Sequence, residues 1–118
     1  MKHIANESDA ELAIHDSARK PIIVYKHSPI CGLSDTAITE FEKFRARESD
    51  RFDFYQVDVI GARKASRKIE ELLGVRHESP QVLMIWDSRC LWHGSHRTLQ
   101  ADRLRTEAEA FWSALPPG

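Results

Sequence analysis

Short apolar runs alternate with longer amphipathic runs along this chain. Residues 22–25 are apolar and mostly β-branched on both faces, which is typical of a strand buried in a parallel sheet. Residues 53–59 predict a second strand. Residues 81–86 and 90–93 predict two more strands, joined as a hairpin by the short turn 87–89.

Four helices are predicted around these strands. Apolar residues three and four positions apart predict helices over residues 31–47 and 62–73, and Gly74 should end the second one in the left-handed conformation. A capping box that begins at Ser8 predicts an earlier helix to about residue 18, and Thr98 can cap a last helix. The faces expected to be buried carry Ile69, Leu72 and Leu73 in the third helix, and Leu104, Ala108, Phe111, Trp112 and Leu115 in the last.

The resulting order of elements is α-β-α-β-α-β-β-α, which predicts the α/β class. A strand–helix–strand unit pairs in parallel through a right-handed crossover, and the closing hairpin then adds antiparallel strands. We therefore expect residues 1–118 to form a single domain with a four-stranded mixed sheet, helices on both faces and an added N-terminal helix.

Charge and composition exclude several classes of protein. Lysine and arginine number 17 and aspartate and glutamate 18, a net charge of −1, whereas a nucleic-acid binder normally carries a basic excess. The longest apolar run is far shorter than the roughly 20 residues of a membrane-spanning helix, and the N-terminus lacks the apolar core of a signal peptide. We expect a cytoplasmic protein with neither a nucleic-acid nor a membrane partner.

The chemistry predicted by the sequence centres on Cys31. A cysteine in the first turn of a helix meets free N–H groups and the positive end of the helix dipole, and both favour the thiolate. Gly32 leaves room for a partner's backbone. Ser34 takes the place of a resolving cysteine, so the Cys-x-x-Ser pattern implies a monothiol cycle. The alternative is a loop cysteine that packs as a small apolar side chain.

Four stretches of the chain resemble the YtxJ-type monothiol bacilliredoxin family. They are residues 25–34, residues 57–60 with Arg63 and Ser66, residues 73–81, and residues 92–96. The resemblance implies a thioredoxin-like fold with strand order 2-1-3-4, a catalytic monothiol at Cys31 and a cis peptide bond before Pro80. It also implies removal of bacillithiol from mixed disulfides on proteins. The family usually reads Cys-Pro-Ile-Ser, whereas this chain reads Cys-Gly-Leu-Ser, which is closer to the Cys-Gly-Phe-Ser of monothiol glutaredoxins.

The remaining candidate residues would form the binding site around Cys31. The backbone of Ser79, Pro80 and Gln81 should pair with an extended substrate, and Lys26 and Arg63 are candidates for holding the carboxylates of a small thiol such as bacillithiol or glutathione.

Histidines should also lie near the thiolate. Pairing through a Ser88-Arg89 turn places His96 opposite Gln81, at the Cys31 end, and His27 and His77 fall in the loops there. Each of these histidines is more often a surface or capping residue, and no tight ligand spacing indicates a metal.

Two other functions stay open at this point. A Cys-Gly-Phe-Ser glutaredoxin carries a [2Fe–2S] cluster, but the two glycines and an acid expected after the last strand are replaced here by Gly94-Ser95-His96. The other alternative is a non-catalytic thioredoxin-like interaction module. If the protein is an oxidoreductase, we expect it to bind no cofactor and to act on S-thiolated proteins as a monomer or weak dimer. Cys90, at the far end of the hairpin, should then be a structural residue.

Overall fold

The computed structural model of the chain describes residues 1–30 and 32–116, and the side chains of these residues except 33 and 34. The elements are β1 (Lys2–His3), α1 (Glu7–Asp16), β2 (Ile22–His27), α2 (Gly32–Glu48), β3 (Asp53–Asp58), α3 (Arg63–Leu73), β4 (Gln81–Trp86), β5 (Arg89–Ser95), the short 3₁₀ helix η1 (His96–Thr98) and α4 (Ala101–Ala114). The α/β class is thus as expected.

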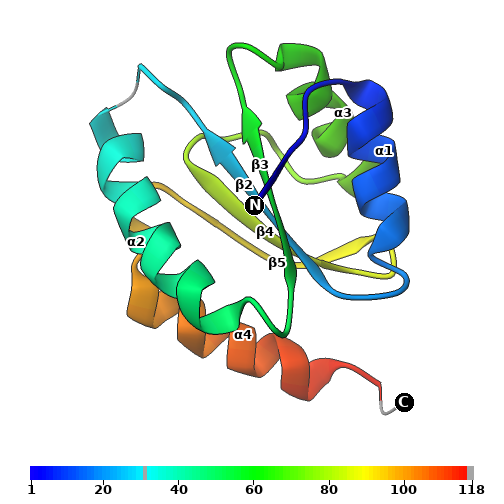
Figure 1. Cartoon of the computed structure of the whole chain (residues 1–118), viewed down its shortest axis with the longest axis vertical. Coiled ribbons are helices and arrows are strands. Elements are labelled where there is room, and N and C mark those ends of the chain that lie inside the picture. Colours follow the sequence, from blue (N-terminus) through cyan, green and yellow to red (C-terminus); the bar gives the residue numbers. More distant parts are fainter. Residues whose placement is uncertain (31, 117–118) are drawn as a thin grey trace.

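One five-stranded mixed sheet forms the middle of the molecule, in the order β1-β3-β2-β4-β5 (Figure 1). β2 pairs with β3 in parallel and with β4 antiparallel, and β4 pairs with β5 antiparallel. The expected order of four strands is present, but the expected number is wrong, because β1 adds a parallel strand at the edge of β3. This strand has two residues, too few to leave a periodic pattern in the sequence.

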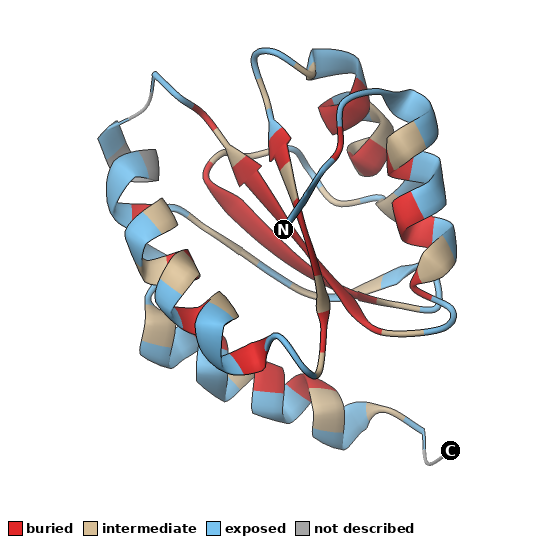
Figure 2. Cartoon of the chain, viewed as in Figure 1, coloured by how far each residue is buried: buried red, intermediate tan, exposed pale blue. Residues whose placement is uncertain are grey.

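Helices cover both faces of the sheet, so its central strands are buried on both sides (Figures 1 and 2). Side chains alternate along β2: Ile23 and Tyr25 face α2 and α4, whereas Ile22 and Val24 face α1 and α3. The α2/α4 side holds a cluster of aromatic rings, with the Tyr25 and Phe41 ring centroids 4.7 Å apart. The N-terminal helix α1 packs beside α3 rather than standing apart.

Several predicted element ends differ from the structure. α1 is capped by Asn6, whose side chain accepts a hydrogen bond from the Asp9 N–H at 2.8 Å, so the capping box at Ser8 is wrong. Thr98 lies in η1 and α4 begins after Gln100, so the prediction that Thr98 caps the last helix is wrong. Leu72 is 42% exposed and does not join the core, whereas Gly74 ends α3 with φ +68° as predicted.

The hairpin register also differs by one residue from the predicted one. Its turn residues are Asp87 and Ser88, with φ values of 51° and 63°. A turn at Asp87 and Ser88, rather than at Ser88 and Arg89, would by itself place Gly94 opposite Gln81, and a bulge between Met84 and Ile85 moves the pairing back by one residue. As a result Ser95, and not His96, lies opposite Gln81.

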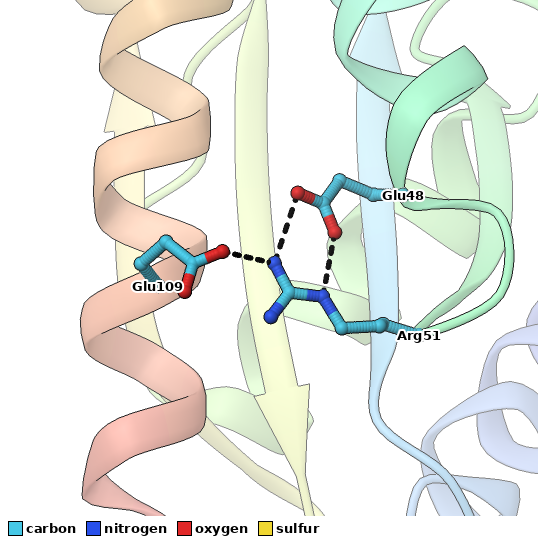
Figure 3. A network of polar contacts seen from close by, with 3 residues as sticks. All are labelled: Glu48, Arg51 and Glu109. Carbon is cyan, nitrogen blue, oxygen red and sulfur yellow. Dashed lines mark hydrogen bonds and ion pairs between the residues drawn. The ribbon is translucent and has the colours of Figure 1, made fainter.

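A network of three charged side chains ties the end of α2 to α4 (Figure 3). Arg51, in the turn after α2, donates hydrogen bonds to both carboxylate oxygens of Glu48, at 2.8 and 3.0 Å, and to Glu109 of α4 at 2.6 Å. The two carboxylates raise the pKa of the Arg51 guanidinium, the Glu48 hydrogen bonds most of all. This network lies at the C-terminal end of α2, a full helix length away from Gly32.

Candidate functional site

The predicted site lies at the edge of the sheet where β2 ends and β4 begins. Cys31, the predicted nucleophile, and the side chain of Ser34 lie outside the described residues. Gly32 begins α2, and a Cβ built on it would have no described atom within 4 Å, which agrees with the expected open approach.

Residues 74–80, the connection from α3 to β4, are held by hydrogen bonds at several points. The Gln81 side chain donates to the Arg76 carbonyl at 3.0 Å, and the Ser95 hydroxyl donates to the Glu78 carboxylate, which lowers the pKa of Glu78. The His96 N–H donates to the Pro80 carbonyl at 3.0 Å. The Ser79–Pro80 peptide bond is cis, as the family resemblance implied. We call residues 74–80 the proline segment.

Beneath the proline segment lies the side chain of Lys26, which is fully buried. Alternation along β2 turns Lys26 toward α3, where its ammonium donates to the Ser66 carbonyl at 3.3 Å. The Lys26 Nζ also lies 3.1 Å from His77 Nδ1. The same ring nitrogen lies 3.1 Å from the Ser66 hydroxyl. In addition the His77 backbone N–H donates to the Glu70 carboxylate.

Burial controls the protonation of this cluster. Loss of hydration lowers the pKa of Lys26 to about 8, against a smaller opposing effect of Glu70. Loss of hydration, followed by the positive charge of Lys26, lowers the pKa of His77 below its ordinary value, and Glu70 and Glu78 partly offset this. Lys26 is therefore charged near pH 7, and His77 is neutral there.

Gln81 completes the buried polar cluster on the same face of the sheet. It is fully buried and lies directly opposite Lys26 in the β2–β4 pairing. Its Nε2 is bonded to the Arg76 carbonyl, whereas its Oε1 has no hydrogen-bond partner among the described residues. The sequence predicts a role for the backbone of Gln81 in pairing with substrate. It does not reveal that the side chain of Gln81 is buried beside Lys26.

The structure does not bring the three predicted histidines together. His27 points to the α2/α4 face, where its Nδ1 lies 3.1 Å from the Tyr25 hydroxyl. His77 closes the Lys26 cluster on the opposite face. His96 is exposed and contacts the proline segment through its backbone N–H. Because Cys31 lies outside the described residues, the expectation that these histidines lie near its thiolate stays a prediction.

Lys26 and Arg63 do not form an outward-facing cationic pair either. The Lys26 ammonium is enclosed, whereas Arg63 is exposed and lines a hollow with Ala5, Asn6 and Glu7 at the start of α1. The sequence does not reveal the burial of Lys26, because lysine is so rarely buried, and nothing in its pattern places Arg63 beside the start of α1. A role of Arg63 in binding a small thiol stays a prediction.

Cys90 has the properties of a structural residue. It is partly buried on β5, and its Sγ lies 3.2 Å from the Trp92 carbonyl. Burial raises the pKa of its thiol to about 11. It pairs with Ile85, which pairs with Ile22 at the start of β2, so Cys90 lies at the opposite end of these strands from Lys26.

Within residues 1–30 and 32–116, no three histidine, cysteine or acidic side chains are grouped as a metal would require. In the same part of the chain, none of the helices has the length and apolarity needed to cross a membrane.

Comparison with known proteins identifies the fold and the family. The chain is similar to a structure described as "A putative oxidoreductase with a thioredoxin fold", with a TM-score of 0.80, 26% identity, and 91% of this chain and 92% of that one covered. It also matches Fasciola hepatica thioredoxin, with a TM-score of 0.75, 20% identity, and 93% and 98% coverage. Plasmodium falciparum thioredoxin matches with a TM-score of 0.74, 14% identity, and 94% and 99% coverage.

These similarities show a thioredoxin fold, as the sequence resemblance implied. The family described as "Monothiol bacilliredoxin BrxC" matches residues 2–104, which include β1 to β5 and the start of α4. The chain therefore belongs to the monothiol bacilliredoxin family.

Proposed function

We propose that this chain is a cytoplasmic monothiol thiol–disulfide oxidoreductase that removes a small thiol, with bacillithiol as the first candidate, from mixed disulfides on proteins. Cys31 is the nucleophile, and Ser34 stands where a dithiol enzyme keeps its resolving cysteine. The observation that carries the proposal is the family match over residues 2–104, which include the Cys-Gly-Leu-Ser sequence.

The reaction has two exchange steps. The Cys31 thiolate attacks the sulfur of the small thiol in the mixed disulfide, so that a new disulfide forms at Cys31 and the substrate protein leaves as a thiolate. A second molecule of small thiol, as thiolate, then attacks this disulfide. The products are the small-thiol disulfide and reduced Cys31, and the proton of the incoming thiol restores the substrate's thiol.

The described residues support this chemistry around Cys31. The open space above Gly32 lets a substrate backbone approach the first turn of α2. The proline segment is held at Arg76, Glu78 and Pro80, so Ser79 belongs to a fixed surface that an extended substrate can pair with. Arg63 is exposed and remains our candidate for a carboxylate of the small thiol, whereas Lys26 is enclosed.

Intact-mass measurement of thiol transfer tests the proposal. The reduced protein is mixed with a model protein that carries bacillithiol, glutathione or cysteine as a mixed disulfide, and the mass gained by the chain identifies the transferred thiol. We expect Cys31→Ser to gain none and Cys90→Ser to retain most of the transfer, because burial keeps the Cys90 thiol protonated.

Three outcomes contradict parts of the proposal. If transfer persists in Cys31→Ser, or falls equally in both variants, the assignment of Cys31 as the nucleophile is wrong. Absence of transfer from every mixed disulfide, with an unreactive Cys31 at neutral pH, favours a non-catalytic interaction module. A brown dimer on purification under anaerobic conditions favours the cluster carrier.

A further inference from the structure

The Lys26 ammonium is a buried charge that thiol exchange at Cys31 does not itself require. Its hydrogen-bond partners among the described residues are two neutral groups, the Ser66 carbonyl and the His77 ring. Burying an ammonium without a hydrogen-bonded carboxylate lowers stability. A buried ammonium that lowers stability indicates that Lys26 has a role at its own position in the fold.

The position of His77 indicates what that role is. Lys26 is fully buried, and its ammonium contacts Nδ1 of His77, a residue exposed to solvent. An ammonium has only donors, and therefore His77 Nδ1 must accept its hydrogen bond. The Ser66 hydroxyl, 3.1 Å away, can donate to the same nitrogen. This contact fixes the neutral ring with its proton on Nε2.

Through this contact His77 anchors the middle of the proline segment. Its N–H is bonded to Glu70 of α3, and its ring is bonded to Lys26 of β2. The neighbouring anchors at Arg76 and Glu78 reach β4 and β5 through Gln81 and Ser95. Without the His77 ring, the described contacts of the segment with β2 are lost, and α3 holds it only through the Gly74 and His77 N–H groups, which both donate to Glu70.

We propose that neutral His77 is the positioning residue of the proline segment: by accepting the hydrogen bond of Lys26 it holds Ser79 and Pro80 in place for thiol exchange, and protonation of its ring releases the segment. This inference rests on the proposed function for its link to exchange, but its structural part stands on the cluster alone. A proton on Nδ1 removes the acceptor of the Lys26 ammonium and places two positive charges side by side.

The surrounding charges set the direction of the pH effect. Lys26 of β2 and Arg67 of α3 disfavour a positive charge on His77, and Glu70 of α3 and Glu78 of the segment itself favour one. Burial and Lys26 outweigh the two acids, so the pKa of His77 lies below its ordinary value. The segment is therefore held at neutral pH and released only on acidification beyond the ordinary pKa of a histidine.

Two substitutions of His77 distinguish the effect of its hydrogen bond to Lys26 from the effect of protonating its ring. In His77→Asn the amide oxygen takes the place of Nδ1 and accepts from Lys26, but it does not titrate. In His77→Ala the acceptor is lost at every pH. His15→Asn, on the exposed side of α1, is the matched control for the loss of a histidine.

The first measurement is the rate of thiol transfer divided by the rate of Cys31 alkylation by iodoacetamide, from pH 5 to pH 8. Alkylation follows the thiolate population alone, so the ratio reports substrate positioning. We expect the ratio to fall at least fivefold on acidification in the wild type and in His15→Asn. In His77→Asn the ratio should not change with pH and should stay within about twofold of the wild-type value at neutral pH. In His77→Ala the ratio should be at least tenfold lower than that value at every pH.

The second measurement is amide hydrogen exchange of residue 77, whose N–H donates to the Glu70 carboxylate; the rate is corrected for the intrinsic pH dependence, and the measurement needs no thiol activity. Protection should fall with acidification in the wild type, not in His77→Asn, and be absent in His77→Ala. Unchanged protection in His77→Ala, or the same acid loss in His77→Asn as in the wild type, would overturn the inference. If no mixed disulfide supports transfer but the protection pattern holds, the proposed function fails and the anchoring role stands.

Discussion

Two cations in this molecule, Lys26 and Arg51, are held in opposite ways. Arg51 lies partly exposed between Glu48 and Glu109, and both carboxylates raise its pKa. Lys26 is fully enclosed and bonded to neutral groups, and burial lowers its pKa to about 8. The first arrangement stabilises the fold. The second one costs stability, and this contrast points to the Lys26 end of the sheet as the functional end.

The largest expected effect is the pH dependence contributed by Lys26. The folded-state pKa, about 8, lies below the ordinary value of 10.5, so the unfolded chain binds more protons between these values and stability rises with pH there. From pH 7 to about pH 10 the free energy of unfolding should rise by about 2.5 kcal/mol more in the wild type than in Lys26→Met. Urea unfolding of both proteins at each pH measures this difference. Parallel curves would mean that the ammonium is solvated in the fold.

A smaller loss of stability is expected at the other cation. Arg51→Met leaves the carboxylate of Glu48, which is 5% exposed, without its bidentate partner. Since Arg51 is itself partly solvated, the free energy of unfolding should fall by about 2 kcal/mol, below the full cost of breaking a buried pair. Urea titration at pH 7 gives the value. Thiol transfer should stay within about twofold of the wild type, and a tenfold loss would show that this network reaches the site.

The smallest effect is expected at Glu109, the exposed member of the same network. Its side chain is 64% exposed, so the ion pair with Arg51 is screened by solvent and salt. Glu109→Gln should cost below about 1 kcal/mol in dilute buffer, and less at high salt. If the free energy of unfolding fell as much as in Arg51→Met, the contact of Arg51 with Glu109 of α4, rather than its contact with Glu48, would be the one that stabilises the fold.

The sequence predicted most of the sheet because its strands carry strong local patterns. Residues 22–25 are apolar on both faces, and the structure places them in the middle of the sheet between two helical layers. Gly74 was identified as a helix stop by its residue type. β1 escaped detection because a two-residue strand is defined by its partner in β3 rather than by its own residues.

The candidate site was only partly predictable, because its decisive feature is a side-chain direction. Lys26 follows Ile22 and Val24 on the same face of β2, so strict alternation turns it inward. Lysine is so rarely buried that the sequence favours an exposed role instead. His77 shows no sign in the sequence of its contact with a residue 51 positions away. The position of the hairpin turn and the bulge, which together place Ser95 opposite Gln81, likewise depend on packing.

The most direct test of the contrast between the two cations is the rate of thiol transfer at pH 7.5 in Lys26→Met and Arg51→Met, measured at a temperature where both variants are more than 95% folded. We expect a crossed result: Lys26→Met transfers at least tenfold more slowly although it is no less stable than the wild type, and Arg51→Met transfers normally although it is less stable. Transfer rates that simply follow the stability of the two variants would contradict it.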